Sequence, residues 1–565
     1  MTCTSHRRPV SLLLVVAFYI MAIAFTNAHF MADSAGYVVS ILAYEGVSEY
    51  VAENPVVRDF RSENPFWDFG HLLWRPVGLV LLKVFSPLSQ LAVGIDPAHN
   101  LFFLFMSLNF AAGLLCCVLL YCLMERLTDR RWVVVLVTIG FVLSNGFLNF
   151  TQTGSPYIIG LAFLLSGLYL LLRRKGDVSL RTSALAGLLF AVSVTMWTLY
   201  GLVVPSIIAA PLVLFGASRR VTRAVMFSAA TFILVTAVTY GLVMFNIGVH
   251  SPGDLRDWIA ASSHGVHTSG ASRMLFGLPR SFIHMGNDGV LFKRFLLHDP
   301  FNPVSAIDLM RASLWKLGLF YLALASTFVA LVVSSARRVL ILFLINAVPV
   351  ICFAVLFDGG AVERYLPLYP IMFLSFAYTI GSLRVPRVLK VLPVMFFAVA
   401  ALANVGEMAR PALAHKQQRT VERLEGVVSR LRPHSWIVTT HLQDEIVNFQ
   451  GSSPFHPLNK HNTYRIYPLV NVNSAQATEW RQQFLSHVLD TWSKDGDVWL
   501  STRLRSPRPQ PDWNWVEGDD PNVSWTDIYN FFAALQMGAL AGGSDGFVLL
   551  DRSNVNEELF KDYDS

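Results

Sequence analysis

Long apolar segments dominate this chain and constrain its fold more than any other feature. A membrane-spanning α-helix needs about 20 consecutive, mostly apolar residues. Eleven runs meet or approach that length: 10–29, 100–124, 132–151, 155–172, 183–199, 201–217, 224–246, 313–333, 338–357, 364–382 and 388–407. Only 15% of the 565 residues are charged, against about 25% in soluble proteins, so the sequence predicts a polytopic α-helical membrane protein.

Basic residues decide how the segment 183–217 is divided, since it is too long for one span and short for two. Lys and Arg concentrate in the short cytoplasmic loops of membrane proteins. Here the basic clusters are Arg7/Arg8, Arg126/Arg130/Arg131, Arg173/Arg174/Lys175, Arg219/Arg220/Arg223, Arg337/Arg338 and Arg384/Arg387/Lys390. If all are cytoplasmic, an even number of spans separates each from the next, and 183–217 crosses twice. We therefore expect about eleven transmembrane helices in the cytoplasmic membrane, with the N-terminus cytoplasmic.

The same topology places three polar regions on the outer face: the loops 30–97 and 248–312, and the tail from about 411. We expect a transmembrane module at 1–410 and an extracytoplasmic domain at 411–565.

Two stretches of the outer loops are expected to lie along the membrane interface. The stretch 76–93 is apolar but interrupted by Lys83 and Pro87, so it is too broken to span and better suited to the interface. A second interfacial helix is expected around 273–297, where basic and apolar residues are mixed.

The tail differs from the rest of the chain in its pattern. Strand-like runs alternate with helix-like ones, which is typical of a small α/β domain. The expected helices are 420–432, 480–492 and 526–537, and the expected strands are 436–440, 498–500 and 547–550.

Cysteine and charge exclude several functional classes. The five cysteines lie almost wholly in or beside apolar segments, so a disulfide framework is not expected and no metal-type spacing exists. A divalent metal is therefore not indicated as a cofactor. The net charge of +6 reflects the basic loop clusters, and we expect no nucleic-acid partner.

Asp33 is the first candidate for chemistry, because it follows the first predicted span by only a few residues. Burial near the membrane raises the pKa of a carboxyl group toward values useful for a base. The alternative is an ordinary interfacial acid or a helix N-cap, since Asp-Ser-Ala-Gly also suits a helix start.

His71 and Arg75 form a second candidate pair where the outer loop returns to the membrane. On a helix, residues four apart share a face, and the donor fork of arginine matches phosphate oxygens. Alternatively, Arg75 is an interface anchor beside Trp74.

Arg364 opens a late span on the outer side, against the positive-inside trend, and is followed by Tyr365 and Tyr369. Pro367 and Pro370 would widen or kink this helix end. The alternative is a snorkelling arginine with interfacial tyrosines.

Together, these features resemble the GT-C superfamily of glycosyltransferases, and more narrowly its protein O-mannosyltransferase and aminoarabinose-transferase branch. The resemblance covers about residues 1–410. It maps Asp33 onto the family's first-loop catalytic acid, and Arg364-Tyr365-Leu366 with Tyr369-Pro370 onto a motif near the lipid phosphate. Arg75-Pro76 matches more loosely.

The resemblance implies transfer of one sugar from a polyprenyl-phosphate carrier to a protein or glycolipid hydroxyl on the non-cytoplasmic face. Arg364 and Arg75 would hold the leaving phosphate, and Asp33 would take the acceptor's proton, with inversion at the anomeric carbon. Charge stabilisation in a dry site is a large catalytic effect. The apolar helices would supply a groove for the prenyl chain.

The chain also departs from the family, because Ser34 follows Asp33 where mannosyltransferases often carry a second acid. This departure leaves the acceptor class and any metal requirement open. An O-antigen ligase or polymerase is an alternative if loop 248–312 holds the essential residues. A lipid-linked sugar flippase is disfavoured, since transporters carry charged groups at mid-membrane and these spans have almost none.

Overall fold

The computed structural model describes residues 8–28, 34–46, 66–91, 97–173, 178–262, 270–285, 288–357, 359–413, 431–432, 434–441, 465–470, 480–513, 515–518, 523–535, 537–541, 546–550 and 552. The chain divides into two compact units. The first unit contains Met1–Tyr44, Asn54–His284 and Lys316–Ala414; the second contains Glu45–Glu53, Met285–Trp315 and His415–Ser565.

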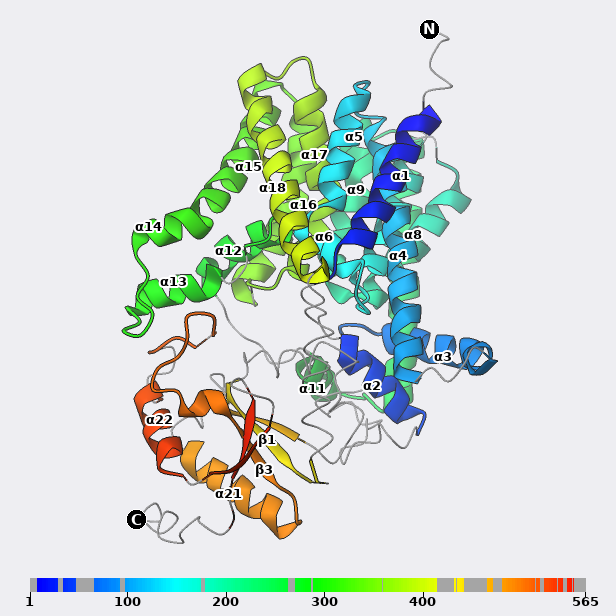
Figure 1. The fold of residues 1–565 in the computed structure, drawn as a ribbon. Coiled ribbons are helices and arrows are strands. Elements are labelled where there is room, and N and C mark those ends of the chain that lie inside the picture. The colour runs from blue at the N-terminus through cyan, green and yellow to red at the C-terminus, as the bar shows by residue number, and fades with distance from the viewer. Residues whose placement is uncertain are drawn as a thin grey trace. The chain divides into compact units, whose positions relative to one another are not determined.

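The first unit is a bundle of apolar helices packed side by side (Figure 1). Its elements are α1 (Arg8–Phe25), α2 (Ser34–Tyr44), α3 (Trp74–Leu91), α4 (Pro97–Met124), α5 (Arg131–Val142), α6 (Asn145–Phe150), α7 (Tyr157–Leu172), α8 (Leu180–Met196), η2 (Thr198–Leu202), α9 (Val204–Phe215), α10 (Arg219–Ile247), α11 (Pro252–Ser262), α12 (Gly270–Phe282), α15 (Trp315–Val333), α16 (Arg337–Leu356), η4 (Glu363–Leu368), α17 (Tyr369–Gly381) and α18 (Arg387–Leu413).

Each of the eleven predicted apolar segments coincides with helical structure, which confirms the polytopic helical fold. Among the residues that the structure describes, six helices are long and apolar enough to cross a membrane, and four further apolar helices are shorter. The ambiguous segment 183–217 divides into α8 and the pair η2–α9, as the charge pattern indicated. The expected interfacial stretch 76–93 corresponds to α3, whereas the one around 273–297 is two helices, α12 and α13 (Asp288–Leu297).

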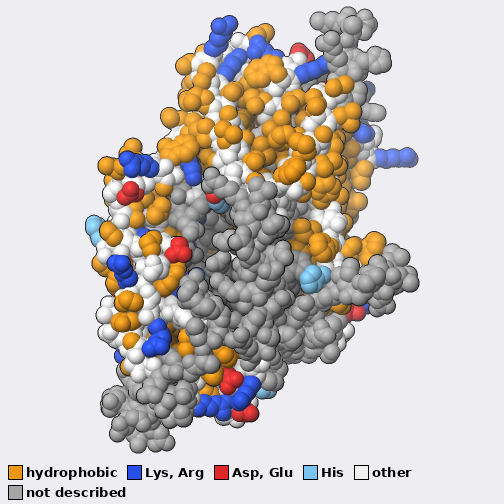
Figure 2. Space-filling model, viewed as in Figure 1, with side chains coloured by type: hydrophobic (Ala, Val, Ile, Leu, Met, Phe, Trp, Pro, Cys, Tyr) orange, Lys and Arg blue, Asp and Glu red, His pale blue; other side chains and the backbone are white. Residues whose placement is uncertain are grey.

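Several basic clusters meet at one end of this bundle. Arg126 Nη1 donates to the Leu172 carbonyl at 3.1 Å, and Arg338 Nη1 donates to the Leu214 carbonyl at 2.8 Å. On the face shown in Figure 2, Lys and Arg side chains gather at this end, above a broad apolar surface. We call it the basic end. That it faces the cytoplasm stays a prediction from the positive-inside pattern.

A non-helical segment between α6 and α7 is buried inside the bundle, where its backbone needs internal partners. Asn109 Nδ2 donates to the Thr153 and Ser155 carbonyls, both at 2.7 Å. Gly154 donates its N–H to Ser34 Oγ at 2.9 Å and accepts from Trp74 Nε1 at 2.9 Å. These bonds hold the starts of α2 and α3 against the bundle.

The tail part of the second unit is an α/β fold, as the alternating pattern of the tail predicted, and the unit also includes Met285–Trp315, mostly from the predicted outer loop 248–312. Its helices are α13, α14 (Ala306–Leu309), the π-helical turn η3 (Met310–Leu314), α21 (Trp480–Ser493), η7 (Thr502–Arg505) and α22 (Trp525–Ala534). Its strands are β1 (Trp436–His441), β2 (Arg465–Val470), β3 (Val498–Ser501), β4 (Met537–Ala541) and β5 (Phe547–Leu550), in the order β2-β1-β3-β5-β4.

The five-stranded sheet is mixed. β1 pairs in parallel with β2 and β3, and β5 pairs antiparallel with β3 and β4. α21 and α22 contribute Trp480, Phe484, Trp525 and Phe532 to a core with the buried residues of the strands. The predicted helix at 420–432 falls almost entirely outside the described residues.

Candidate active site

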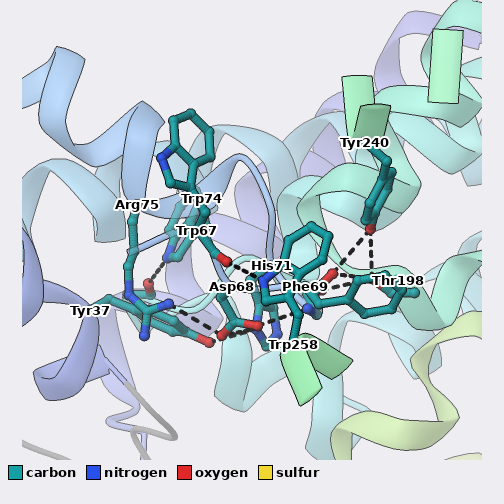
Figure 3. Close-up of polar contacts among 12 residues, drawn as sticks. Tyr37, Trp67, Asp68, Phe69, His71, Trp74, Arg75, Thr198, Tyr240 and Trp258 are labelled. Atoms are coloured by element: carbon teal, nitrogen blue, oxygen red, sulfur yellow. Dashed lines mark hydrogen bonds and ion pairs between the residues drawn. The ribbon is translucent and has the colours of Figure 1, made fainter. Parts of the chain in front are cut away.

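A buried charged cluster lies at the approach to α3 (Figure 3). Asp68, His71 and Arg75 are only 2%, 7% and 3% exposed. Asp68 Oδ2 lies 3.3 Å from Arg75 Nη1 and 3.4 Å from His71 Nδ1. The Arg75 guanidinium lies over the Tyr37 ring of α2, 5.3 Å from its centroid, and the Tyr37 hydroxyl is 3.2 Å from His71 Nδ1. Two helices and one loop therefore supply a single charged group.

The loop that carries Asp68 is fixed through its backbone carbonyls. Trp258 Nε1 on α11 donates to the Trp67 carbonyl at 2.7 Å. Thr198 Oγ1 in η2 and the Tyr240 hydroxyl on α10 donate to the Phe69 carbonyl at 2.9 and 3.1 Å. Figure 3 shows Phe69, Tyr240 and Trp258 beside the cluster. Because three separate elements bind this loop, it holds its charged side chains in place.

Asp68 is held as an ionised carboxylate and is too weak a base to serve as the proton acceptor. Burial by itself would raise its pKa, but the hydrogen bond and charge of His71, the charge of Arg75 and the Gly70 N–H outweigh burial and hold the pKa well below its ordinary value. Gly70 donates to Asp68 Oδ1 at 2.7 Å. A base works best with a pKa near the operating pH. The geometry therefore suits Asp68 to orienting His71 and balancing the charge of Arg75.

His71 has one nitrogen committed and one available. Nδ1 faces Asp68 and Tyr37, whereas Nε2 is buried and has no hydrogen-bond partner among the residues that the structure describes. The ring also lies near Tyr157, with centroids 5.9 Å apart. When Nδ1 carries a proton and donates it to Asp68, Nε2 is left with a lone pair. This arrangement can accept a proton from a bound hydroxyl.

The other predicted arginine, Arg364, lies in η4, between α16 and α17. Its guanidinium carbon is 5.9 Å from the Phe353 ring centroid, and its Nε has no hydrogen-bond partner in the described part of the chain. Tyr365 and Tyr369 are fully buried. The Tyr365 hydroxyl donates to the Gly359 carbonyl at 2.6 Å, and the Tyr369 hydroxyl bonds Ser281. Both tyrosines therefore fix the segment, and the Nε–H of Arg364 is available to bind a ligand.

The Asp68 cluster and the Arg364 segment lie at the same end of the bundle, opposite the basic end. α8 and α17 each have one terminus at the basic clusters and the other at this end. An aromatic series leads from one group toward the other: Tyr157 and Trp197 have ring centroids 4.7 Å apart, Trp197 and Tyr200 5.2 Å apart, and η2 contacts η4.

The structure brings His71 and Arg75 together, but mainly through Asp68. The helix begins at Trp74, so His71 precedes it in a turn instead of sharing a helical face with Arg75. Asp33, the predicted base, lies outside the described residues.

Sequence reasoning missed Asp68, although the spacing Asp68, His71, Arg75 was visible. An acidic residue three positions before a histidine and seven before an arginine is the sequence pattern that could have indicated this cluster.

Comparisons with known proteins give a structural likeness only. No family model and no curated protein matches the chain. Two solved structures of ArnT from Cupriavidus metallidurans are similar to it. The form bound to undecaprenyl phosphate has 10% identity and a TM-score of 0.49, covering 97% of this chain and 98% of that one. The apo form has 13% identity and a TM-score of 0.39, covering 96% and 97%. These alignments transfer no residue role to this chain.

Within the described ranges, no group of three or more His, Cys, Asp or Glu side chains could hold a metal ion.

Proposed function

We propose that this protein is a GT-C-type glycosyltransferase that moves one sugar from a polyprenyl-phosphate carrier to an acceptor hydroxyl on the non-cytoplasmic face. The acceptor is a protein or a glycolipid. The observation that carries the proposal is the buried Asp68–His71–Arg75 cluster at one end of an apolar bundle. Buried charges within membrane proteins are costly to maintain and mark functional sites. The motif resemblance of Asp33 and Arg364 supports the same assignment.

The reaction requires one bond to form and one to break. The acceptor oxygen attacks the anomeric carbon, the bond from that carbon to the phosphate oxygen breaks, and the phosphate leaves with the electron pair. The acceptor proton passes to a base. Attack opposite the phosphate inverts the anomeric centre. A cation beside the leaving phosphate stabilises the charge that develops there, and Arg364, with a buried donor available, is proposed for that role.

Asp33 is proposed as the base, and His71 is its competitor. Asp68 and His71 have the carboxylate–imidazole arrangement that orients an imidazole for proton transfer. If Asp33 is the base, we propose that His71 and Arg75 bind the substrate, with Arg75 contributing positive charge for the phosphate and Asp68 limiting the net charge of the site.

A transfer assay with purified protein in proteoliposomes tests the proposal. A panel of polyprenyl-phosphate sugars is supplied with a hydroxyl acceptor, and product and released polyprenyl phosphate are both measured. We expect Asp33→Asn to abolish transfer with expression intact, and the exposed control Asp490→Asn to retain it. Near-normal turnover of Asp33→Asn with an inactive His71→Gln would move the base to His71. No transfer by the wild type from any donor would overturn the proposal.

Arg364→Ala separates donor use from the proton step. We expect it to raise the donor KM and lower kcat/KM by about tenfold or more, since a hydrogen bond to a charged group contributes roughly 1.5–3 kcal/mol. The acceptor KM should change little. Unchanged donor dependence would make Arg364 an interface residue.

The ligase or polymerase alternative has its own marker residue. His284, in the predicted outer loop 248–312, lies close enough to Lys316 and Arg280 for their charges to act on it. If His284→Gln abolished glycan transfer while Asp33→Asn did not, this alternative would replace the proposal. A flippase would move labelled carrier across the bilayer without forming any transfer product.

A further inference from the structure

A cavity of about 380 Å³ opens at the basic end of the bundle and extends to the first turns of α17. It is bounded by the ends of α4, α7 and α9, the start of α16 and one face of α17. Leu214, Phe215 and Leu342 form part of its apolar wall, whereas Arg126 and Arg173 are its charged members. Ligand pockets in proteins typically measure about 300–1,000 Å³, so the cavity is large enough to hold a ligand.

The arginines at this cavity are held by helix ends and not by carboxylates. Arg126 donates to the Leu172 carbonyl at the end of α7, and Arg173 Nη2 lies 3.4 Å from Thr182 Oγ1. Arg173 Nε is buried and has no hydrogen-bond partner in the ranges that the structure covers. Within those ranges neither arginine pairs with an acidic side chain.

Arg338 adds a third guanidinium at the same end through its bond to the Leu214 carbonyl. Arg219 and Arg223 lie at the start of α10, a few residues after Phe215. Both are exposed and neither lines the cavity. The cavity therefore combines an apolar interior with two border guanidinium groups that pair with no acidic side chain among the described residues. A guanidinium has five donors in a planar fork that matches phosphate oxygens.

We propose that this cavity binds an anionic phospholipid of the bilayer, with its phosphate between Arg126 and Arg173 and an acyl chain against Leu214, Phe215 and Leu342. Free phosphate would use the arginines but leave the apolar wall uncovered. A zwitterionic lipid would leave the positive charge poorly balanced. Basic pockets between transmembrane helices bind anionic headgroups for this reason. The proposal does not depend on the proposed transferase activity.

Thermal melting of delipidated full-length protein in neutral detergent tests the site. The probes are dioleoyl phosphatidylglycerol, dioleoyl phosphatidylcholine, undecaprenyl phosphate and inorganic phosphate, each titrated separately. We expect phosphatidylglycerol alone to raise the melting temperature saturably. Arg126→Gln/Arg173→Gln should raise its half-maximal concentration about tenfold or more. Arg219→Gln/Arg223→Gln removes the same charge from exposed positions and should leave that concentration unchanged.

A second measurement covers the case in which the double variant folds poorly. Wild-type protein is crosslinked with a phosphatidylglycerol analogue that carries a photoreactive group on its acyl chain. Crosslinks at Leu214, Phe215 or Leu342 support the proposal, and crosslinks spread evenly over the lipid-facing surface overturn it. Equal stabilisation by phosphatidylcholine, by inorganic phosphate or only by undecaprenyl phosphate also overturns it, as does an equal effect of both double variants.

Discussion

Replacing Asp68 with asparagine should destabilise the protein, because it removes one partner from a buried ion pair. Asp68 and Arg75 are 2% and 3% exposed, with 3.3 Å between Oδ2 and Nη1. In Asp68→Asn the guanidinium stays buried without a carboxylate. Breaking a buried pair in this way costs about 3–5 kcal/mol. We therefore expect a melting temperature lower by roughly 3–10 °C.

The measurement is intrinsic-fluorescence melting of purified protein in detergent, with Asp490→Asn as the matched control. Asp490 pairs with Lys494 at 3.0 Å, but both side chains are about half exposed. Such helix-surface pairs contribute about 0.3–0.5 kcal/mol, so this control should melt close to the wild type. A fall for Asp68→Asn no larger than that of the control would refute the buried-pair account.

The pH dependence provides an independent check on Asp68. Its folded-state pKa is lowered, so its contribution is present above the unfolded value of about 3.9 and is lost as pH falls through the folded pKa. The difference between wild type and Asp68→Asn should therefore be nearly constant from pH 6 to 8. A difference that vanished within this range would assign the titration to another group.

Burial, Lys316 and Arg280 lower the pKa of His284 to about 4, so the stability of the wild type should fall as pH drops from about 6.5 toward 4. In His284→Gln the melting temperature should depend less on pH over this range. An unchanged dependence would contradict this. Gly277→Ala would drive a methyl group into the Gly359 carbonyl and displace the turn before Arg364. Both the melting temperature and the use of the donor should therefore fall. Gly241→Ala, which has open space around it, should change neither. Arg294→Met should leave Asp299 buried without its charge partner. It also removes the hydrogen bonds that Arg294 donates to the carbonyls of Pro511, Trp513 and Trp515. Limited proteolysis should therefore cleave the second unit of this variant faster than that of the exposed control Lys494→Met.

The helical part of the fold was predictable because apolar length and basic clusters report directly on the membrane environment. Each predicted segment coincides with helical structure, and the basic clusters explain why 183–217 divides in two. In the tail, the strands at 436–440, 498–500 and 547–550 were found from local pattern. β2 and β4 were missed, since Arg465–Val470 includes a proline and Met537–Ala541 begins where a helix was expected to end.

The candidate site was less predictable, because its central residue depends on tertiary contacts. Asp68 sits among aromatic residues in a stretch that looks like an exposed loop. Its burial depends on Trp258, Thr198 and Tyr240, which bind the carbonyls of its neighbours from more than 100 residues away. No local spacing contains that information. His71 and Arg75 were found for their chemistry, but the carboxylate that joins them was not.

The two ends of the bundle therefore differ in how their arginines are used. At the Asp68 end, a buried carboxylate balances Arg75, and its loop is fixed by three elements. At the basic end, Arg126 and Arg173 border an apolar cavity without a carboxylate partner in the described part of the chain. A balanced, fixed arginine suits a site where charge changes during a reaction, because it is already oriented. An unbalanced arginine beside an apolar wall suits permanent binding of an anionic lipid. Arg75→Gln should therefore reduce sugar transfer more than Arg126→Gln/Arg173→Gln does. The double variant should in turn lose more of the stabilisation by phosphatidylglycerol than Arg75→Gln does. The reverse pattern would contradict this difference between the two ends.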